Sequence, residues 1–204
     1  MSYIENLTKD YGDFLLKVQR LELDAKGLTA LMGPSGSGKT SLFRILLGLE
    51  KADRGRWMFN DEDMLQKPIQ KRQLGAVFQS YELFPHLSAQ DNILFAAQAR
   101  GIARDKAQSN LKRLTDSLKL QSCLNRKAEV LSGGEKQRVA IARALIGEPV
   151  FLLMDEPFAA LDIDLRKEAR ALVKETLNEW KVPALIITHD QEDVAALGAR
   201  LTNI

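Results

Sequence analysis

The chain has 204 residues, of which 45% are hydrophobic, so it can bury one sizeable core. Its 29 Lys and Arg residues nearly balance its 27 Asp and Glu residues, and no basic stripe argues for a nucleic-acid partner. The single cysteine, Cys123, excludes an intrachain disulfide, and no stretch has the ~18 consecutive apolar residues that cross a bilayer.

Short strands are expected in the first third of the chain. We predict them over residues 3–7, 14–18 and 56–59, with turns at 11–13 and 60–61. Because these strands are short and separated by turn residues, they predict an antiparallel layer beside the main core.

A glycine-rich loop follows a predicted strand over Leu28–Met32 and precedes a predicted helix over 42–47. Its glycines allow positive φ angles that turn backbone N–H groups toward phosphate oxygens, and the helix adds its positive dipole end. We expect Lys39 to reach the β- and γ-phosphates and Thr40 to bind Mg²⁺. An ordinary Gly/Ser-rich loop is the alternative. The residues expected at the phosphates of ATP or GTP are Gly33, Pro34, Ser35, Gly36, Ser37, Gly38, Lys39, Thr40 and Ser41.

Gln79 ends a strand predicted over residues 74–78, and its amide oxygen can coordinate Mg²⁺. A polar strand terminus without further function is the alternative. Apolar residues at helical spacing then predict helices over residues 89–127, with Cys123 as a small buried side chain.

A second candidate anion site comes at Ser132, Gly133 and Gly134. These residues precede an apolar helical face, so a hydroxyl and two amides stand at a helix N-terminus. Taken alone, the same residues also fit an ordinary capped helix.

Two carboxylates, Asp155 and Glu156, end a buried strand predicted over residues 150–154, where ligands of open α/β sheets gather. Asp155 is expected to hold Mg²⁺ and Glu156 to polarise a water that attacks the γ-phosphorus. His189 ends another core strand, predicted over residues 184–188. The alternatives are a solvated acidic pair and a hydrogen-bonded core histidine.

The order of these motifs resembles that of the ATP-binding-cassette ATPases, the nucleotide-binding subunits of ABC transporters, from about Tyr3 to the last residue. The resemblance implies an α/β fold with a P-loop NTPase core, a mostly parallel sheet and an antiparallel β layer. It also implies one domain over residues 1–204, with a helical subdomain inserted at about 80–145.

The resemblance also implies roles for individual residues. Gln79 would report the γ-phosphate to the helical subdomain, and His189 would contact the γ-phosphate and help to fix the attacking water. Tyr11 matches the aromatic residue that stacks on adenine, and Asp162 matches the acidic residue of a loop that crosses to the opposite subunit.

The 92 residues from Lys39 to Leu131 (131 − 39) separate two phosphate sites. In the family, the lysine loop of one subunit and the serine loop of another enclose one ATP, which implies a head-to-tail dimer of two copies with MgATP. The further partners implied are transmembrane permease subunits and, indirectly, a solute-binding protein. The implied location is cytoplasmic and peripheral, on the inner face of the cell membrane, with solute specificity in other subunits.

Residues 78–88 with Asn92 and Ile93 look most like bacterial importers that use a solute-binding protein. Within this segment, large apolar residues after a polar strand end predict a surface for a membrane subunit, with core packing as the alternative. The residues of this predicted surface are Tyr81, Leu83, Phe84 and Pro85, with His86 as a surface or partner contact.

Two departures from the family pattern and two rival functions accompany this interpretation. The chain has 15 residues after His189 (204 − 189), where the family usually continues through further strands and a helix, and no glutamate follows Gly27.

A non-transport member of the superfamily needs a long coiled coil, for which the 92 residues between Lys39 and Leu131 leave no room. A GTPase would need a base-reading Asn-Lys-x-Asp, which is absent, and neither a GTPase nor a P-loop kinase explains the Ser132 loop.

Overall fold

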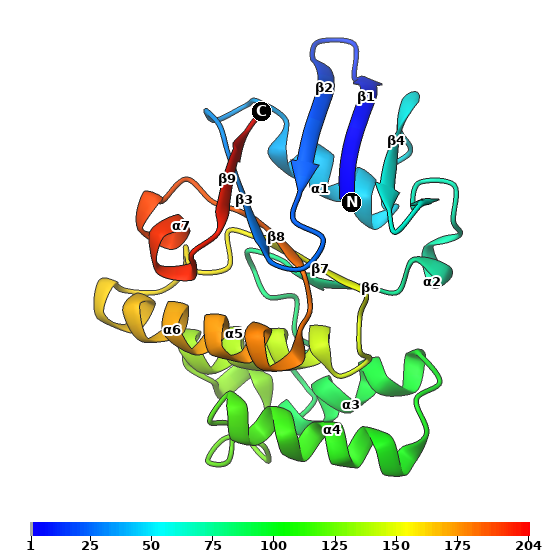
Figure 1. Cartoon of the computed structure of the whole chain (residues 1–204). Helices are drawn as coiled ribbons and strands as arrows, with labels where there is room; N and C mark the ends of the chain where they lie inside the picture. Colours follow the sequence, from blue (N-terminus) through cyan, green and yellow to red (C-terminus); the bar gives the residue numbers. More distant parts are fainter. Residues whose placement is uncertain (1) are drawn as a thin grey trace.

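The computed structural model describes residues 2–204, which form two β-sheets and seven α-helices (Figure 1). The antiparallel sheet has the order β2-β1-β4-β5, and the parallel sheet has the order β6-β7-β8-β3-β9. The strands are β1 (Ser2–Asp10), β2 (Leu15–Leu23), β3 (Leu28–Met32), β4 (Arg54–Phe59), β5 (Glu62–Asp63), β6 (Leu74–Val77), β7 (Phe151–Asp155), β8 (Ala184–Ile187) and β9 (Arg200–Asn203). The helices are α1 (Lys39–Leu47), α2 (Ile69–Arg72), α3 (Ala89–Ala99), α4 (Arg104–Ser117), α5 (Gly133–Leu145), α6 (Ile163–Trp180) and α7 (Gln191–Leu197), with a 3-10 turn η1 (Ala128–Val130).

Burial along the strands follows the sheet to which they belong. Strand β2 alternates between buried and exposed residues except at Gln19 and Arg20, which are both exposed, because one face of the antiparallel sheet is solvated. Strands β7 and β8 are buried at every residue, as expected for a parallel sheet that is covered on both faces. All four strand pairings of the larger sheet are parallel, so the expected α/β class with an antiparallel layer is confirmed.

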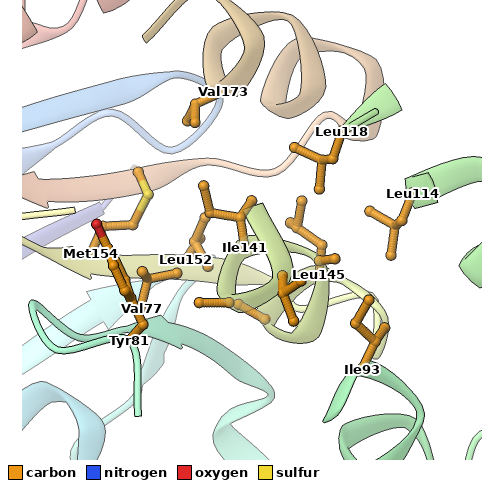
Figure 2. Packing of buried hydrophobic residues seen from close by; sticks show 14 of the residues in the cluster. Val77, Tyr81, Ile93, Leu114, Leu118, Ile141, Leu145, Leu152, Met154 and Val173 are labelled. Atoms are coloured by element: carbon orange, nitrogen blue, oxygen red, sulfur yellow. The ribbon is translucent and has the colours of Figure 1, made fainter. Parts of the chain in front are cut away.

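The parallel sheet separates two hydrophobic cores. The intersheet core lies between the two sheets and contains α1, with Phe43, Trp57, Phe151, Leu153 and Ile187 among its buried residues. The helical core lies on the other face, where α5 and α6 lie next to the sheet and α3 and α4 pack on the far side of α5 (Figure 1). Figure 2 shows Ile141 and Leu145 of α5 between the strand residues Leu152 and Met154 and the side chains of Ile93, Leu114 and Leu118.

The predicted elements need four corrections. The edge strand β9 was not expected, because half-exposed residues pairing in parallel with β3 leave no apolar run. The short elements β5 and α2 were also not expected. The helical prediction over residues 89–127 is wrong after Ser117, where Lys119 takes a φ of +52° and the chain continues in turns. The boundaries of an inserted subdomain at about 80–145 stay a prediction, since α5 packs on both α3 and β6.

Cys123 is buried, as predicted, and its thiol donates to the carbonyl of Leu120 at 3.4 Å. Across residues 2–204, no helix combines the length and the apolar character that a membrane span requires.

Candidate nucleotide site

The glycine-rich loop joins the end of β3 to the start of α1. Gly38, at the N-cap of α1, has a φ of +93°, and a Cβ built there would lie 2.7 Å from Cδ1 of Leu16. Glycine is therefore required by both the backbone angle and the close approach of β2. No side chain caps the N-terminus of α1, so its N–H groups are available to an anion.

Two side chains of the loop fit a phosphate ligand. The ammonium of Lys39 donates to the carbonyl oxygens of Gly33 and Pro34, both at 2.8 Å, which holds the positive charge inside the loop. The Oγ of Ser37 is buried and has no hydrogen-bond partner in the structure. Because an unpartnered buried hydroxyl is unfavourable, this oxygen fits a site that a polar ligand completes.

The catalytic candidates lie at the same edge of the sheet as this loop. Parallel pairing places Val77 beside Met154, Met154 beside Ile186, and Ile186 beside Ala30. The carboxyl ends of β6, β7, β8 and β3 therefore carry Gln79, the two carboxylates, His189 and the glycine-rich loop side by side. Gln79 itself is exposed in a turn just after β6.

Asp155 is a buried carboxylate beside the loop, with 7% of its surface exposed. Burial raises the pKa of Asp155, the charge of Glu156 raises it further, and the Thr40 hydroxyl and Lys39 ammonium lower it. A carboxylate in this setting gains from a bound cation. Among residues 2–204, no three His, Cys, Asp or Glu side chains gather as a metal cage.

The backbone turns sharply at Glu156. Its φ is +48°, a left-handed conformation that disfavours a residue with a Cβ by ~1 kcal/mol. Its N–H donates to the carbonyl of Ile187 at 2.9 Å, and the next carbonyl, that of Pro157, accepts from Gln137 at 2.9 Å. These contacts hold the strained turn in place and fix where the Glu156 side chain leaves the sheet.

His189 forms a pair with Glu156. Its Nδ1 lies 2.9 Å from Oε1 and 2.8 Å from Oε2 of Glu156, while 71% of the His189 side chain is exposed. The hydrogen bond and the charge of Glu156 raise the pKa of His189, and Asp190 and Asp193 add to the rise. The predicted base and the predicted histidine therefore meet, although 33 residues separate them.

Tyr11 lies in the turn between β1 and β2. Its ring stacks on Phe14 with centroids 6.2 Å apart, and the Phe14 ring would lie 2.9 Å from a Cβ at Gly38. The Tyr11 hydroxyl donates to Glu50, a partner that no local sequence pattern indicates, because the two residues are 39 positions apart. Burial and this hydrogen bond raise the pKa of Tyr11. An aromatic face thus stands beside the glycine-rich loop.

Ser132 and Asp162 both cap helices. Ser132 Oγ accepts from the N–H of Glu135 at 3.3 Å, and the Glu135 carboxylate accepts from the N–H of Ser132 at 2.8 Å, which forms a capping box on α5. Asp162 accepts from the N–H of Leu165 at 2.9 Å at the start of α6. The α5 residues pack in the helical core and the α1 residues in the intersheet core, so the Ser132 and Lys39 loops start helices on opposite faces of the sheet.

The expected surface around residues 81–85 needs a correction at Tyr81. Tyr81 is 5% exposed and packs against Val77 and Met154 (Figure 2), and its hydroxyl donates to Pro157 at 3.4 Å. Burial raises its pKa to about 12. The core-packing alternative is therefore the right one for this residue, because a φ of +62° turns the ring inward.

Two aromatic residues remain at the surface near Tyr81. Phe84 is half-buried and meets Phe95 of α3 edge to face, with centroids 4.9 Å apart. Phe95 is 49% exposed. It was not among the residues predicted for this surface, because its position in the sequence also fits a helix face. His86 is exposed, as expected. Beside these rings lies a groove of about 320 Å³, lined by Leu74, Gly75, Ala76, Phe78, Phe84, Phe95, Ala96, Ala99, Arg100, Arg143 and Ala144.

Comparisons with known proteins show which family and fold the chain is similar to. Residues 16–159 match the family model described as ABC transporter. The chain is 44% identical over 191 residues to the sulfate/thiosulfate import ATP-binding protein CysA of Nephroselmis olivacea, covering 93% of this chain and 56% of that protein. It is 42% identical over 199 residues to the spermidine/putrescine import ATP-binding protein PotA of Mesoplasma florum, covering 97% of this chain and 57% of that protein. The chain thus spans little more than half the length of these relatives.

Solved structures are also similar. The dimeric ATP-binding cassette MJ0796 in a post-hydrolysis state bound to ADP and Pi has a TM-score of 0.83 and 29% identity, covering 100% of this chain and 94% of that one. CbiO1 from Clostridium perfringens, part of the ABC transporter complex cbiONQ, has a TM-score of 0.83 and 29% identity over 96% of this chain and 81% of that one. This chain belongs to the ABC transporter family.

Proposed function

We propose that the chain binds MgATP at the carboxyl edge of its parallel sheet and hydrolyses it to drive transport across a membrane. The observation that carries the proposal is the convergence of the Lys39 loop, Asp155 and the Glu156–His189 pair at one sheet edge. The ADP and Pi bound in the dimeric cassette MJ0796 are the products of such a reaction, which supports ATP as the substrate.

Each residue has a proposed task at the bound nucleotide. The Tyr11 ring stacks on adenine, while the α1 amides and the Lys39 ammonium hold the phosphates. The residues that would hold Mg²⁺ are Thr40, Asp155 and, through its amide oxygen, Gln79. When bound, the metal would neutralise negative charge on the phosphates.

The reaction step concerns Glu156 and His189. Glu156 accepts a proton from water as the water oxygen bonds to the γ-phosphorus, and the bond from that phosphorus to the bridging β–γ oxygen breaks. His189 holds the γ-phosphate and keeps the Glu156 carboxylate aligned through its Nδ1 contact. The products are ADP and phosphate.

We test this assignment with Glu156→Gln, which keeps the shape of the side chain and removes the base. ATP binding should persist, and kcat should fall about 100-fold or more, as for loss of a general base. Lys39→Ala should instead weaken ATP binding, because the phosphates lose their main charged partner. Glu62→Gln, on an exposed strand, is the control and should hydrolyse ATP normally. Near-normal turnover by Glu156→Gln would remove Glu156 from the base role.

We further propose a head-to-tail dimer in which the Ser132 loop of one copy closes on the Lys39 loop of the other. The placement of these loops at helices on opposite faces of the sheet supports this arrangement, as does the dimeric state of MJ0796. Asp162 would then contact the partner copy as well as cap α6.

The proposed transport direction is import, supported by the import ATP-binding proteins among the relatives. The chain would work on the inner face of the membrane with permease subunits, which receive solute from a solute-binding protein. The groove beside Phe84 and Phe95 is the proposed docking place for a permease segment. Gln79, just upstream in the same connection, would pass the state of the γ-phosphate to it.

A further inference from the structure

A cluster of charges around a buried arginine lies beside His189. Arg170 of α6 is 5% exposed, and its guanidinium donates to three carboxylates. Its Nε lies 2.6 Å from Asp193, its Nη1 2.7 Å from Glu192, and its Nη2 2.6 Å from Asp190. An arginine buried this deeply is found where its planar fork holds specific partners in fixed positions.

Two of these partners control the backbone on both sides of His189. The N–H of Asp190 donates to the Thr188 hydroxyl at 3.1 Å, and that hydroxyl donates to the Asp193 carboxylate. Thr188 is 1% exposed, and Asp193 is 3% exposed. Because Thr188 and Asp190 are both fixed, the backbone that carries His189 has little freedom to move relative to Glu156.

A second arginine joins this cluster to the turn that follows Glu156. The Nη1 of Arg166 lies 3.4 Å from the Asp190 carboxylate, and its Nη2 donates to the carbonyl of Leu161 at 2.9 Å. Arg166 therefore contacts both the turn that follows Glu156 and Asp190, the residue that follows His189.

The charged cluster is not the only link between α6 and α7. A separate contact, from the Lys174 ammonium to the carbonyl of Ala196 at 3.0 Å, already joins the two helices one turn farther along α6. Hydrophobic packing adds to it, since Val173 and Leu197 share the helical core. The charged cluster lies at the N-terminal end of α7, next to His189, where Asp190 is the helix N-cap.

We propose that Arg170, assisted by Arg166, is a positioning residue that holds the His189 ring against Glu156 through Asp190, Asp193 and Thr188. This inference rests on the proposed roles of Glu156 and His189 in hydrolysis. It adds that the pair is aligned from inside the protein, before any nucleotide arrives.

The test is an NMR titration of the His189 ring in Arg170→Met. The chain has 2 histidines, so exposed His86 serves as the internal reference. If only the charge of Arg170 mattered, its removal would leave Asp190 and Asp193 unpaired, and the pKa of His189 would rise. If Arg170 positions the ring, contact with Glu156 is lost and the pKa falls toward the value measured in Glu156→Gln. We expect a fall, and an unchanged or higher pKa in the folded variant would overturn the proposal.

Two further variants keep the test decisive. Lys174→Met removes the other α6–α7 contact and should leave the pKa of His189 unchanged, so an equal fall there would assign the effect to helix packing and overturn the proposal. If Arg170→Met does not fold, Arg166→Met takes its place, because that side chain is 25% exposed. A smaller fall in the same direction is expected, and a folded Arg166→Met with an unchanged pKa would overturn the proposal.

Steady-state kinetics separate this inference from the proposed function. Arg170→Met should lower kcat about tenfold with little change in KM for ATP, as misalignment of a catalytic pair predicts, and Arg170→Lys should recover part of the loss. The NMR result does not depend on turnover. If Glu156→Gln hydrolyses ATP normally, the proposed base is wrong, while the fall in pKa still shows whether Arg170 positions His189.

Discussion

Nδ1 of His189 lies 2.9 Å from Oε1 of Glu156 and thereby joins the ends of two neighbouring parallel strands. Neither residue reaches this position through local structure alone. Glu156 depends on a left-handed backbone angle, and His189 depends on the charged residues that hold its neighbours. Because this contact raises the pKa of His189, titration of His189 reports whether the two side chains are in contact.

The first prediction concerns stability and pH. The pKa of His189 is raised in the folded state above its ordinary value of 6.5, so the charged imidazole stabilises the fold. This contribution is complete below 6.5 and is lost as pH rises through the folded pKa. The effect is small, because the ring is mostly exposed and screened by solvent.

Urea unfolding between about pH 5.5 and about pH 9 measures this loss. His189→Gln should remove that part of the pH dependence, and His86→Gln should keep it. Identical pH profiles for the wild type and His189→Gln would show that the Glu156 contact does not shift the titration of His189.

The second prediction tests whether two copies share each nucleotide. Lys39→Ala and Ser132→Arg each damage every composite site in a homodimer. A mixture of the two forms some heterodimers with one intact site, so ATP-dependent dimerisation and hydrolysis should partly return on mixing.

Ser88→Arg is the matched control for the second prediction. Ser88 caps α3 as Ser132 caps α5, by accepting from a backbone N–H at 3.0 Å, so both variants lose a helix cap. Ser88→Arg alone should hydrolyse ATP, because both composite sites remain. If mixing restores nothing while all the variants are folded, the Ser132 loop does not act in the partner's site.

The third prediction separates two roles of Asp162. Asp162→Ala removes the N-cap of α6 and should lower the free energy of unfolding by about 1 kcal/mol. Asp162→Ser keeps a capping oxygen and should recover that stability without recovering hydrolysis, because the carboxylate proposed to reach the partner copy is still missing. Chemical denaturation and ATPase assays on the three proteins measure both quantities. Full hydrolysis by Asp162→Ser would leave Asp162 as a helix cap only.

The fourth prediction concerns the groove beside the two surface phenylalanines. Phe95→Asp places a charge on a ring that is 49% exposed, so the chain should fold and keep its basal ATP hydrolysis while losing recovery with membranes that contain its permease subunits. Leu49→Asp, at a side chain that is 54% exposed elsewhere, should keep membrane recovery. Normal recovery of folded Phe95→Asp would place the permease contact on another surface.

Phe84→Asp tests the same groove from the half-buried ring. Its loss of membrane recovery counts only if thermal unfolding shows an intact fold, because this side chain also packs on Phe95. An unfolded Phe84→Asp would assign that residue to packing, and Phe95→Asp would then decide the docking surface alone.

Local patterns in the sequence predicted the chemistry of the site and the order of its parts. Gly38 needs a positive φ, buried strands need continuous apolar runs, and a lysine beside a helix start attracts phosphate, so each of these features leaves a local pattern. Because parallel strands place their carboxyl ends at one edge, the sequence also placed Asp155, Glu156 and His189 in one neighbourhood.

The contacts between side chains that are far apart in the sequence depend on the packing of the whole fold. The Glu156–His189 contact and the Arg170 cluster join residues that are 20 to 33 positions apart, and no periodic pattern marks such pairs. Tyr81 became a core residue because its left-handed backbone turns the ring toward Met154, although a large apolar residue in a turn reads equally well as a surface. Edge strand β9 likewise takes its conformation from hydrogen bonds to β3 and not from its own half-exposed residues. Local backbone preferences and hydrophobic periodicity can be recognised in short stretches of sequence. Contacts between distant residues depend instead on how the sheets and helices pack in the folded protein.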